Sequence, residues 1–273
     1  MLKSDQLKKH SMLEHETSNE VSLKATLETI PRIPLIVPGD NLGEVLKNAI
    51  DNSNICLQDK DVLVIAQKIV SKAEGRVVSL TEYIPSKQAI EISQKSGKDP
   101  RLVQLILNES QEVRWVMDGT SQSPGIIVVK HHLGHVCSGA GIDTSNTGSA
   151  DKDSAILLPE DPDSSAKRIA DYFSETSGLK IGVMVIDTLG DRNRIGSIGK
   201  AIGVANVPAR VVENGLSDLD GKQMLLSDVA FADSLAGLAM ILMGNPNGGS
   251  PVVLIRGVDY PFTPTAKIRD VFI

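Results

Sequence analysis

The chain has 273 residues, 41% of them hydrophobic, which is enough to bury a core in one large domain or in two interleaved lobes. Its net charge of −6 argues against a broad basic surface for nucleic acid, and its aromatic content of 3% argues against base-stacking platforms and sugar-binding grooves. Two cysteines, Cys56 and Cys137, are too few for a disulfide framework. A local basic pocket for a phosphorylated ligand stays open.

The N-terminal part of the chain is polar, mixed in charge and without the apolar centre of a signal peptide. We expect residues 1–30 to form a mobile extension and residues 31–273 to form the catalytic unit. The longest strongly apolar stretch, residues 235–243, is too short to cross a bilayer. These features predict a cytoplasmic protein that binds neither a membrane nor nucleic acid.

The first half of the chain shows alternating signals for helices and strands. A helix is predicted from Asp40, with Asn41 and Glu44 as a capping pair. The further predicted elements are a buried strand at 61–66, helices at 86–95 and 100–108, and a strand at 125–130. A stretch rich in Gly and Ser follows at 137–146, and it is typical of a loop that lets backbone approach a ligand.

In the second half, Asp163 is predicted to cap a helix that runs to about residue 176. A strand at 181–186 is expected to end at Asp187, and a Gly-rich segment follows at 190–203. The last predicted elements are a helix from 227 or 228 to 243 and a strand at 251–256.

The predicted strands and helices mix without a regular βαβ rhythm. This order favours an α+β (mixed α/β) fold with two interleaved lobes over a Rossmann or P-loop fold. The Gly-rich segment at 190–203 agrees, because it matches neither G-x-G-x-x-G nor the Gly-Lys-Ser/Thr ending of a P-loop.

Two carboxylates occupy positions that typically face a cleft. Asp143 lies in a Gly-rich loop after a strand, and Asp187 lies at the end of another strand. Mg²⁺ and Mn²⁺ take hard oxygen ligands, often one or two carboxylates together with substrate phosphates. The alternative is that each aspartate only caps a turn. Aspartyl-phosphate chemistry is disfavoured, because Leu189 stands where such enzymes carry a second Asp.

Several basic residues are candidates for binding an anionic ligand. Lys72 follows a buried strand and can reach a nucleotide phosphate, although a polar turn is the alternative. Arg192, Arg194 and Lys200 lie in the second Gly-rich segment, where a solvated basic turn is equally compatible with the pattern.

A histidine cluster gives two further alternatives. His131, His132 and His135 lie close to Cys137, which admits a zinc site, but the spacing matches no common zinc pattern. Cys137 is also a candidate nucleophile, without a sequence feature that identifies its base.

Taken in order, several segments resemble the coenzyme F420-0:L-glutamate ligase family, also called the F420 γ-glutamyl ligase family. No single segment is decisive, but the ordered set covers nearly the whole chain after residue 30. The segments are 33–36, 39–40, 69–76, 136–137, 140–146, 157–163, 187–188, 201–204, 220–221, 243–244 and 252–257.

The resemblance implies a GTP-dependent acid–amino-acid ligase of coenzyme F420 biosynthesis. Such an enzyme joins L-glutamate to the phospholactyl carboxylate of F420-0 through an acyl phosphate, and many members add a second, γ-linked glutamate. The implied ions are Mn²⁺ or Mg²⁺, two in number, and K⁺. The implied partners are GTP, L-glutamate and F420-0, in a homodimer.

The resemblance also assigns roles to residues. Asp143 and Asp187 are implied as catalytic metal ligands, with Thr188 and the weaker ligand Asn245 at a second metal. The implied nucleotide-site residues are Ile33, Pro34, Leu35, Ile36, Gln67, Lys68, Lys72, Asn146, Met243, Gly244, Asn245, Gly248 and Gly249.

Two departures from the family pattern leave alternatives open. Asn245 stands where the family can place a metal-binding Glu, and a neutral amide is a weaker ligand. The segment 189–196 lacks the aromatic residue that family members often carry there. The alternatives are a related amino-acid ligase that acts on another phosphorylated carboxylate, and a non-catalytic nucleotide-binding relative.

Overall fold

The computed structural model describes residues 24–190, 195–213, 215–217, 220–225, 227–244 and 250–272. Five strands form a central sheet in the spatial order β1-β12-β2-β8-β9. They are β1 (Thr26–Thr29), β2 (Val62–Ala66), β8 (Gly182–Gly190), β9 (Ser197–Ala205) and β12 (Val252–Arg256). Only β2 and β8 are parallel neighbours, whereas the other pairs in this sheet are antiparallel. The expected α+β class is confirmed, because a Rossmann sheet is mostly parallel.

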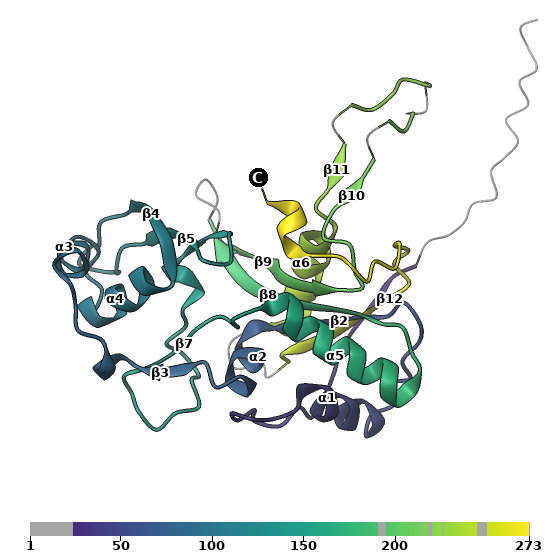
Figure 1. Ribbon diagram of the computed structural model, residues 1–273, viewed down its shortest axis with the longest axis horizontal. Coiled ribbons are helices and arrows are strands. Elements are labelled where there is room, and N and C mark those ends of the chain that lie inside the picture. Colours follow the sequence, from purple (N-terminus) through teal and green to yellow (C-terminus); the bar gives the residue numbers. More distant parts are fainter. Residues whose placement is uncertain are drawn as a thin grey trace, which may run out of the picture.

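Helices cover both faces of this sheet (Figure 1). α1 (Leu42–Asp51) and α5 (Pro162–Ser177) pack on one face, where Leu63 and Val183 enter the core. α6 (Phe231–Met243) packs on the other face, where Val64 and Met184 enter a second core. Because successive strand residues point to opposite faces, strands covered on both sides are continuous apolar runs. This explains why 61–66 and 181–186 were recognisable as buried strands.

A smaller lobe is inserted between α2 (Gln67–Ala73) and α5, at the left of Figure 1. It holds a sheet of order β4-β5-β6, and the β3-β7 ladder carries the chain into and out of it. Its elements are β3 (Val77–Ser79), η1 (Leu80–Glu82), α3 (Lys87–Ser96), α4 (Pro100–Asn108), β4 (Ser110–Val116), β5 (Ile127–His131), β6 (Val136–Ser138), η2 (Gly139–Gly141) and β7 (Ser154–Ile156). The chain thus leaves the larger lobe after α2 and returns to it at α5, so the two lobes are interleaved in sequence as expected.

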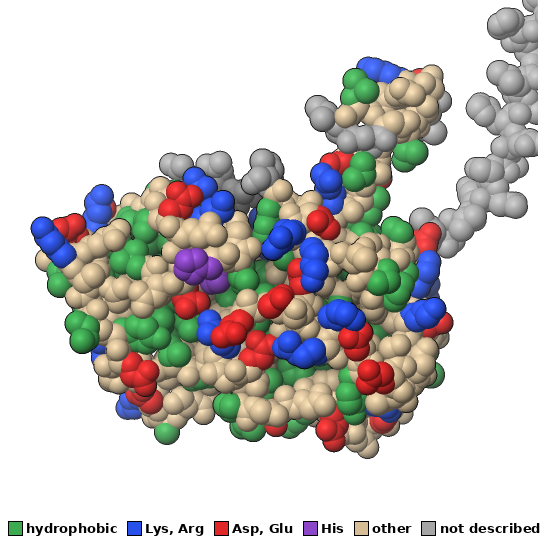
Figure 2. All heavy atoms as spheres, in the orientation of Figure 1, with side chains coloured by type: hydrophobic (Ala, Val, Ile, Leu, Met, Phe, Trp, Pro, Cys, Tyr) green, Lys and Arg blue, Asp and Glu red, His purple; other side chains and the backbone are tan. Residues whose placement is uncertain are grey.

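The remaining elements lie at the periphery. β10 (Val211–Val212) and β11 (Asp228–Val229) form a hairpin that projects from the body, and η3 (Ile268–Val271) lies near the C-terminus (Figure 1). Figure 2 shows acidic and basic side chains interspersed over one face of the molecule. No helix in the described part of the chain is long and apolar enough to span a membrane.

The local signals for the starts of α1, α3 and α4 were reliable. The Asn41 side chain accepts a hydrogen bond from the Glu44 backbone N–H at 3.4 Å, so the predicted cap of α1 is confirmed. Ser86 caps α3, and Pro100 opens α4 behind the cap Asp99. The predicted helices at 86–95 and 100–108 therefore agree with the structure to within one residue.

The predicted boundary of the N-terminal extension is too late. Residues 1–30 were expected to be mobile, but Thr26–Thr29 form β1, which pairs with β12 at the edge of the central sheet. Ile30 is 1% exposed and belongs to the core. Residues 1–23 lie outside the described residues. An edge strand with alternating exposed and half-buried positions gives a weak hydrophobic signal, which explains the error.

Asp163 was expected to cap α5, but Asp161 caps it and its carboxylate accepts the Ser164 N–H at 3.0 Å. Asp163 instead turns inward, is 8% exposed and accepts the backbone N–H groups of Val204 and Ile268. Burial raises the pKa of Asp163, while these two hydrogen bonds oppose the shift. This carboxylate therefore fastens α5 to β9 and to η3.

Two further expectations about the second half were wrong. The Gly-rich segment 190–203 was not expected to form a strand, yet Ser197–Ala205 is β9. Gly203 allows the close approach of α5, since a Cβ there would lie 2.4 Å from the Pro162 backbone. The long helix was expected from 227 or 228, but Asp228 and Val229 belong to β11 and α6 begins at Phe231.

Candidate active site

The parallel strands β2 and β8 end at the same edge of the central sheet, and a cavity of about 620 Å³ opens there. Ala66, the last residue of β2, pairs with Ile186 of β8. β8 does not end at Asp187 as expected; it continues to Gly190 beside β9, so Asp187 lies just beyond its parallel neighbour. Side chains at this position can turn into the crevice beyond the sheet, where α/β proteins commonly bind ligands.

The cavity brings together segments that are far apart in the sequence. Of the predicted site residues, those that line it are Ile33, Pro34, Leu35, Ile36, Gln67, Lys68, Lys72, Asp143, Asn146, Asp187, Thr188, Met243 and Gly244. The other three, Asn245, Gly248 and Gly249, lie outside the described residues, as do Arg192 and Arg194. The convergence is thus a feature of the fold, while the role of each residue stays a prediction.

The backbone of the smaller lobe holds Asp143 at the cavity. The Asp143 N–H donates to the Ile156 carbonyl at 3.0 Å, and the Asp143 carbonyl accepts the Ile156 N–H at 2.8 Å. The preceding turn, η2, has positive φ at Gly139, Ala140 and Gly141. A Cβ on Gly141 would lie 2.8 Å from Leu158, so this turn needs glycine for both its conformation and its packing.

The two carboxylate oxygens of Asp143 have different partners. Oδ1 accepts the Ser145 N–H at 2.7 Å and the Ser145 hydroxyl at 2.8 Å. Oδ2 lies 2.5 Å from the ammonium nitrogen of Lys68, on α2. Burial alone would raise the pKa of Asp143, but the hydrogen bonds from Lys68 and Ser145 outweigh it and hold this pKa below its ordinary value. Asp143 is therefore an ionised carboxylate at neutral pH.

Asp187 has a contrasting environment. Burial raises the pKa of Asp187 to about 6, against the hydrogen bond from the Thr188 backbone N–H. The negative charge of Asp143 adds to the rise, whereas Lys68 opposes it. The two negative carboxylates repel each other in one cavity, so a cation bound between them would stabilise the ionised form of both.

The donor set suits a hard divalent cation that also binds a phosphorylated ligand. Asp143, Asp187 and the Thr188 hydroxyl supply oxygen, as Mg²⁺ and Mn²⁺ prefer. Across the described ranges, no group of three His, Cys, Asp or Glu side chains converges on one point. The Lys68 ammonium lies among Asp143 Oδ2, the Ser145 carbonyl and the Ser145 hydroxyl, so a positive charge already fits this group of oxygens. The residues therefore fit a metal ion that completes its coordination with phosphate oxygens and water.

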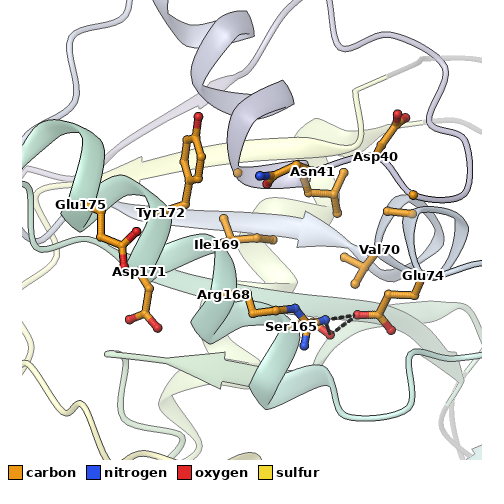
Figure 3. Close-up of a pocket in the computed structure, with 14 residues that line it drawn as sticks. Asp40, Asn41, Val70, Glu74, Ser165, Arg168, Ile169, Asp171, Tyr172 and Glu175 are labelled. Atoms are coloured by element: carbon orange, nitrogen blue, oxygen red, sulfur yellow. Dashed lines mark hydrogen bonds and ion pairs between the residues drawn. The ribbon is translucent and has the colours of Figure 1, made fainter.

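A second cavity, of about 490 Å³, lies between α1, α2 and α5 (Figure 3). Arg168 and Ser165 both turn toward Glu74 there, and Arg168 lies 2.5 Å from its carboxylate. Asp171 is paired with Lys167 at 2.7 Å. None of the described candidate site residues lines this cavity. The Arg168 guanidinium is already paired with Glu74, so the first cavity is the better candidate for the active site.

The histidine alternatives find no support in the geometry. The rings of His131 and His135 stack at 5.2 Å, and burial lowers their pKa values to about 3 and about 4. His132 instead lies 3.0 Å from the Asn108 carbonyl oxygen through its Nε2 atom. Burial raises the pKa of Cys137 to about 12, with Asp187 adding to the rise, so this thiol is neutral and a poor nucleophile.

Sequence reasoning did not single out Ser145, which contacts both Asp143 and Lys68. The pattern Asp143-Thr144-Ser145 is a signal for it, because an Asp side chain often accepts the backbone N–H two residues on. Ser138, Met240 and Ser250 also line the cavity and were not predicted. Ser138 ends β6, Met240 lies on α6 and Ser250 precedes β12, and only the tertiary structure brings the three together.

Comparison with known proteins supplies a family. A family model described as F420-0:Gamma-glutamyl ligase matches residues 31–257. A protein named coenzyme F420:L-glutamate ligase from Methanosarcina mazei is 40% identical over 243 residues, which cover 88% of this chain and 89% of that protein. Proteins of the same name from Methanocaldococcus jannaschii and Methanothermobacter thermautotrophicus are 39% and 40% identical, each over 84% of this chain and 87% of their own length.

Proposed function

The chain belongs to the F420-0:gamma-glutamyl ligase family, and on this premise we propose that it joins L-glutamate to coenzyme F420-0 with GTP as the phosphate donor. The observation that supports this most is the meeting of Asp143 and Asp187 with Lys68 and Lys72 in one cavity. A reaction that activates a carboxylate by phosphoryl transfer needs both kinds of group there. The acidic side chains hold cations, and the lysines neutralise phosphate.

The proposed chemistry has two steps. Attack of a tail carboxylate oxygen of F420-0 on the γ-phosphorus of GTP breaks the bond to the bridging oxygen, releases GDP and gives an acyl phosphate. The amine of L-glutamate then attacks the acyl carbon, phosphate leaves with the electron pair of the C–O bond, and the amine loses a proton as the amide forms. The first step is needed because oxide is too poor a leaving group for direct attack.

The chain's own residues have distinct tasks in this scheme. Asp143, Asp187 and Thr188 would hold divalent metal, with Asn245 proposed as a further and weaker ligand. Mn²⁺ or Mg²⁺, two ions in our proposal and accompanied by K⁺, neutralises phosphate oxygens when bound. Ile33–Ile36, Met240 and Met243 give the cavity an apolar wall suited to a planar ring. A second glutamate and a homodimer stay predictions.

Lys72 is proposed to bind the nucleotide phosphates. Burial and the neighbouring Lys68 lower the pKa of Lys72, so its ammonium gains from an anionic ligand. We expect Lys72→Met to raise the KM for GTP about tenfold, the loss of one charge-assisted hydrogen bond. The KM for L-glutamate should change much less. Initial rates measured against each substrate test this.

The control for this variant is Lys60→Met, because the Lys60 side chain is exposed and its ammonium pairs with the exposed Asp259, outside the cavity. Its kinetic constants should equal those of the wild type. An unchanged GTP dependence in Lys72→Met would remove Lys72 from the nucleotide site.

The proposed function is tested by mass spectrometry of a reaction with purified protein, F420-0, GTP, L-glutamate, Mn²⁺ and K⁺. The expected product is F420-0 extended by one or more glutamyl units, absent when GTP is omitted. GTP hydrolysis without a mass shift would point instead to a related ligase with another acceptor carboxylate. Metal-dependent GTP binding without hydrolysis would point to a non-catalytic relative.

A further inference from the structure

We propose that the Lys68 ammonium is a resident cation of the Asp143 loop, which a divalent metal ion must displace and which nucleotide phosphate draws away. The inference rests on the proposed function for the identity of the competing metal and phosphate. It assigns Lys68 a positioning role beyond phosphate binding. In this proposal the metal ion and the Lys68 ammonium bind the same oxygen, Asp143 Oδ2, in turn and not together.

The argument starts from the two oxygens of Asp143. Oδ1 is already engaged by the Ser145 N–H and hydroxyl, at 2.7 and 2.8 Å. Oδ2 is therefore the oxygen best placed for a cation, and the Lys68 ammonium lies 2.5 Å from it. The same ammonium lies 3.1 Å from the Ser145 carbonyl oxygen and 3.3 Å from its hydroxyl. Lys68 thus occupies a small oxygen-lined cation position.

A metal ion and the ammonium cannot share this position at low cost. A metal–oxygen bond of about 2.0–2.2 Å to Oδ2 would place two positive charges within about 4 Å of each other. The ion pair is mostly shielded from water, with the Lys68 and Asp143 side chains 25% and 32% exposed. Repulsion there is weakly screened, so binding of one cation expels the other.

Lys68 can leave without any change in the backbone. It lies on α2, whose buried residues Gln67, Val70 and Ser71 anchor the helix, while the flexible lysine stem reaches into the cavity. Lys72, one helical turn on, lines the same cavity without an ion pair to Asp143. Phosphate bound between these lysines gives Lys68 a second anionic partner and frees Oδ2. Nucleotide phosphate and metal therefore favour each other's binding, and the coupling is reciprocal.

The test is a titration of the nucleotide-free protein with Mn²⁺ alone, in which isothermal titration calorimetry measures the affinity for the metal ion. Lys68→Met should bind Mn²⁺ about tenfold more tightly than the wild type, because it removes the competing charge. Lys68→Arg keeps the charge and should bind no more tightly than the wild type. Lys72→Met removes a charge from the same cavity without freeing Oδ2, so its gain should stay below about threefold. Equal or weaker Mn²⁺ binding by a folded Lys68→Met would overturn the proposal.

A second measurement uses the wild-type protein and does not depend on how any variant folds. Amine acylation with an N-hydroxysuccinimide ester, read out by peptide mass spectrometry, reports how accessible each lysine is. Saturating Mn²⁺ should speed the labelling of Lys68 while leaving exposed Lys60 unchanged. Unchanged labelling of Lys68 at Mn²⁺ saturation would contradict displacement.

The outcomes separate this inference from the proposed reaction. Glutamylated product without a gain of Mn²⁺ affinity in Lys68→Met leaves the ligase function standing and removes the resident-cation role. Tighter Mn²⁺ binding without any glutamylated product leaves the role of Lys68 standing and removes the reaction.

Discussion

Replacing Asp187 with Asn is expected to lower kcat for glutamyl transfer about 10³-fold, the range seen when a group that stabilises transition-state charge is lost. Asp187 is the cavity carboxylate whose charge gains most from a bound cation, because burial raises its pKa to about 6. Asparagine keeps the size of the side chain but removes that charge. Turnover measured with saturating GTP, Mn²⁺ and glutamate gives the readout, and near-normal turnover would remove Asp187 from the metal site.

The same variant carries its own test of folding. A carboxyl whose folded-state pKa is raised stabilises the fold below its unfolded value, near 4, and this contribution is lost as pH rises through about 6. The metal-free wild type should therefore lose stability across this window, whereas Asp187→Asn should lose less. At pH 7 the variant should be at least as stable as the wild type in thermal denaturation. Asp259→Asn, at an exposed position, is the matched control and should change neither activity nor stability.

The sequence predicted the parts of this fold whose signal is local. The runs at 61–66 and 181–186 are buried on both faces, so their apolar composition alone identifies them as strands. The Asn41 cap acts over three residues and was predictable for the same reason, whereas the cap of α5 was placed at Asp163 instead of Asp161. β9 was missed because its glycines hide the strand pattern, although its partner β8 is the preceding strand of the chain. β1 was missed because its exposure alternates and its partner β12 lies more than 200 residues away in sequence.

The candidate site follows the same division. Asp143 and Asp187 were identifiable from their positions in a Gly-rich loop and in a strand that reaches the cleft. The contact of Lys68 with Asp143 could not be identified from the sequence. It joins α2 of the larger lobe to a loop of the smaller lobe that lies 75 residues further along the chain. The insertion of the smaller lobe between α2 and α5 creates this contact. A cation position that spans the two lobes is therefore a property of the topology, and no short motif encodes it.

Arg256→Ala is expected to cost about 3–5 kcal/mol of stability, which lowers the melting temperature by about 10 °C. The Asp61 carboxylate is 1% exposed, and Arg256 of β12 donates to both its oxygens, at 2.8 and 2.6 Å. Among the residues that the structure describes, the Gln58 backbone N–H, at 2.8 Å, is the one further hydrogen-bond donor to the Asp61 carboxylate. Removal of the guanidinium leaves a buried charge that one amide cannot satisfy. Thermal and urea denaturation measure the loss.

Two companion variants show whether the buried charge is the cause. Lys60→Ala breaks an ion pair between exposed side chains and should cost less than about 1 kcal/mol. Adding Asp61→Asn to Arg256→Ala removes the stranded charge, so the double variant should be more stable than Arg256→Ala alone. A double variant no more stable than the single one would assign the loss to missing packing by the arginine stem. Because Pro251 precedes β12 at the cavity and Arg256 ends that strand, kcat below the melting transition should stay near the wild-type value.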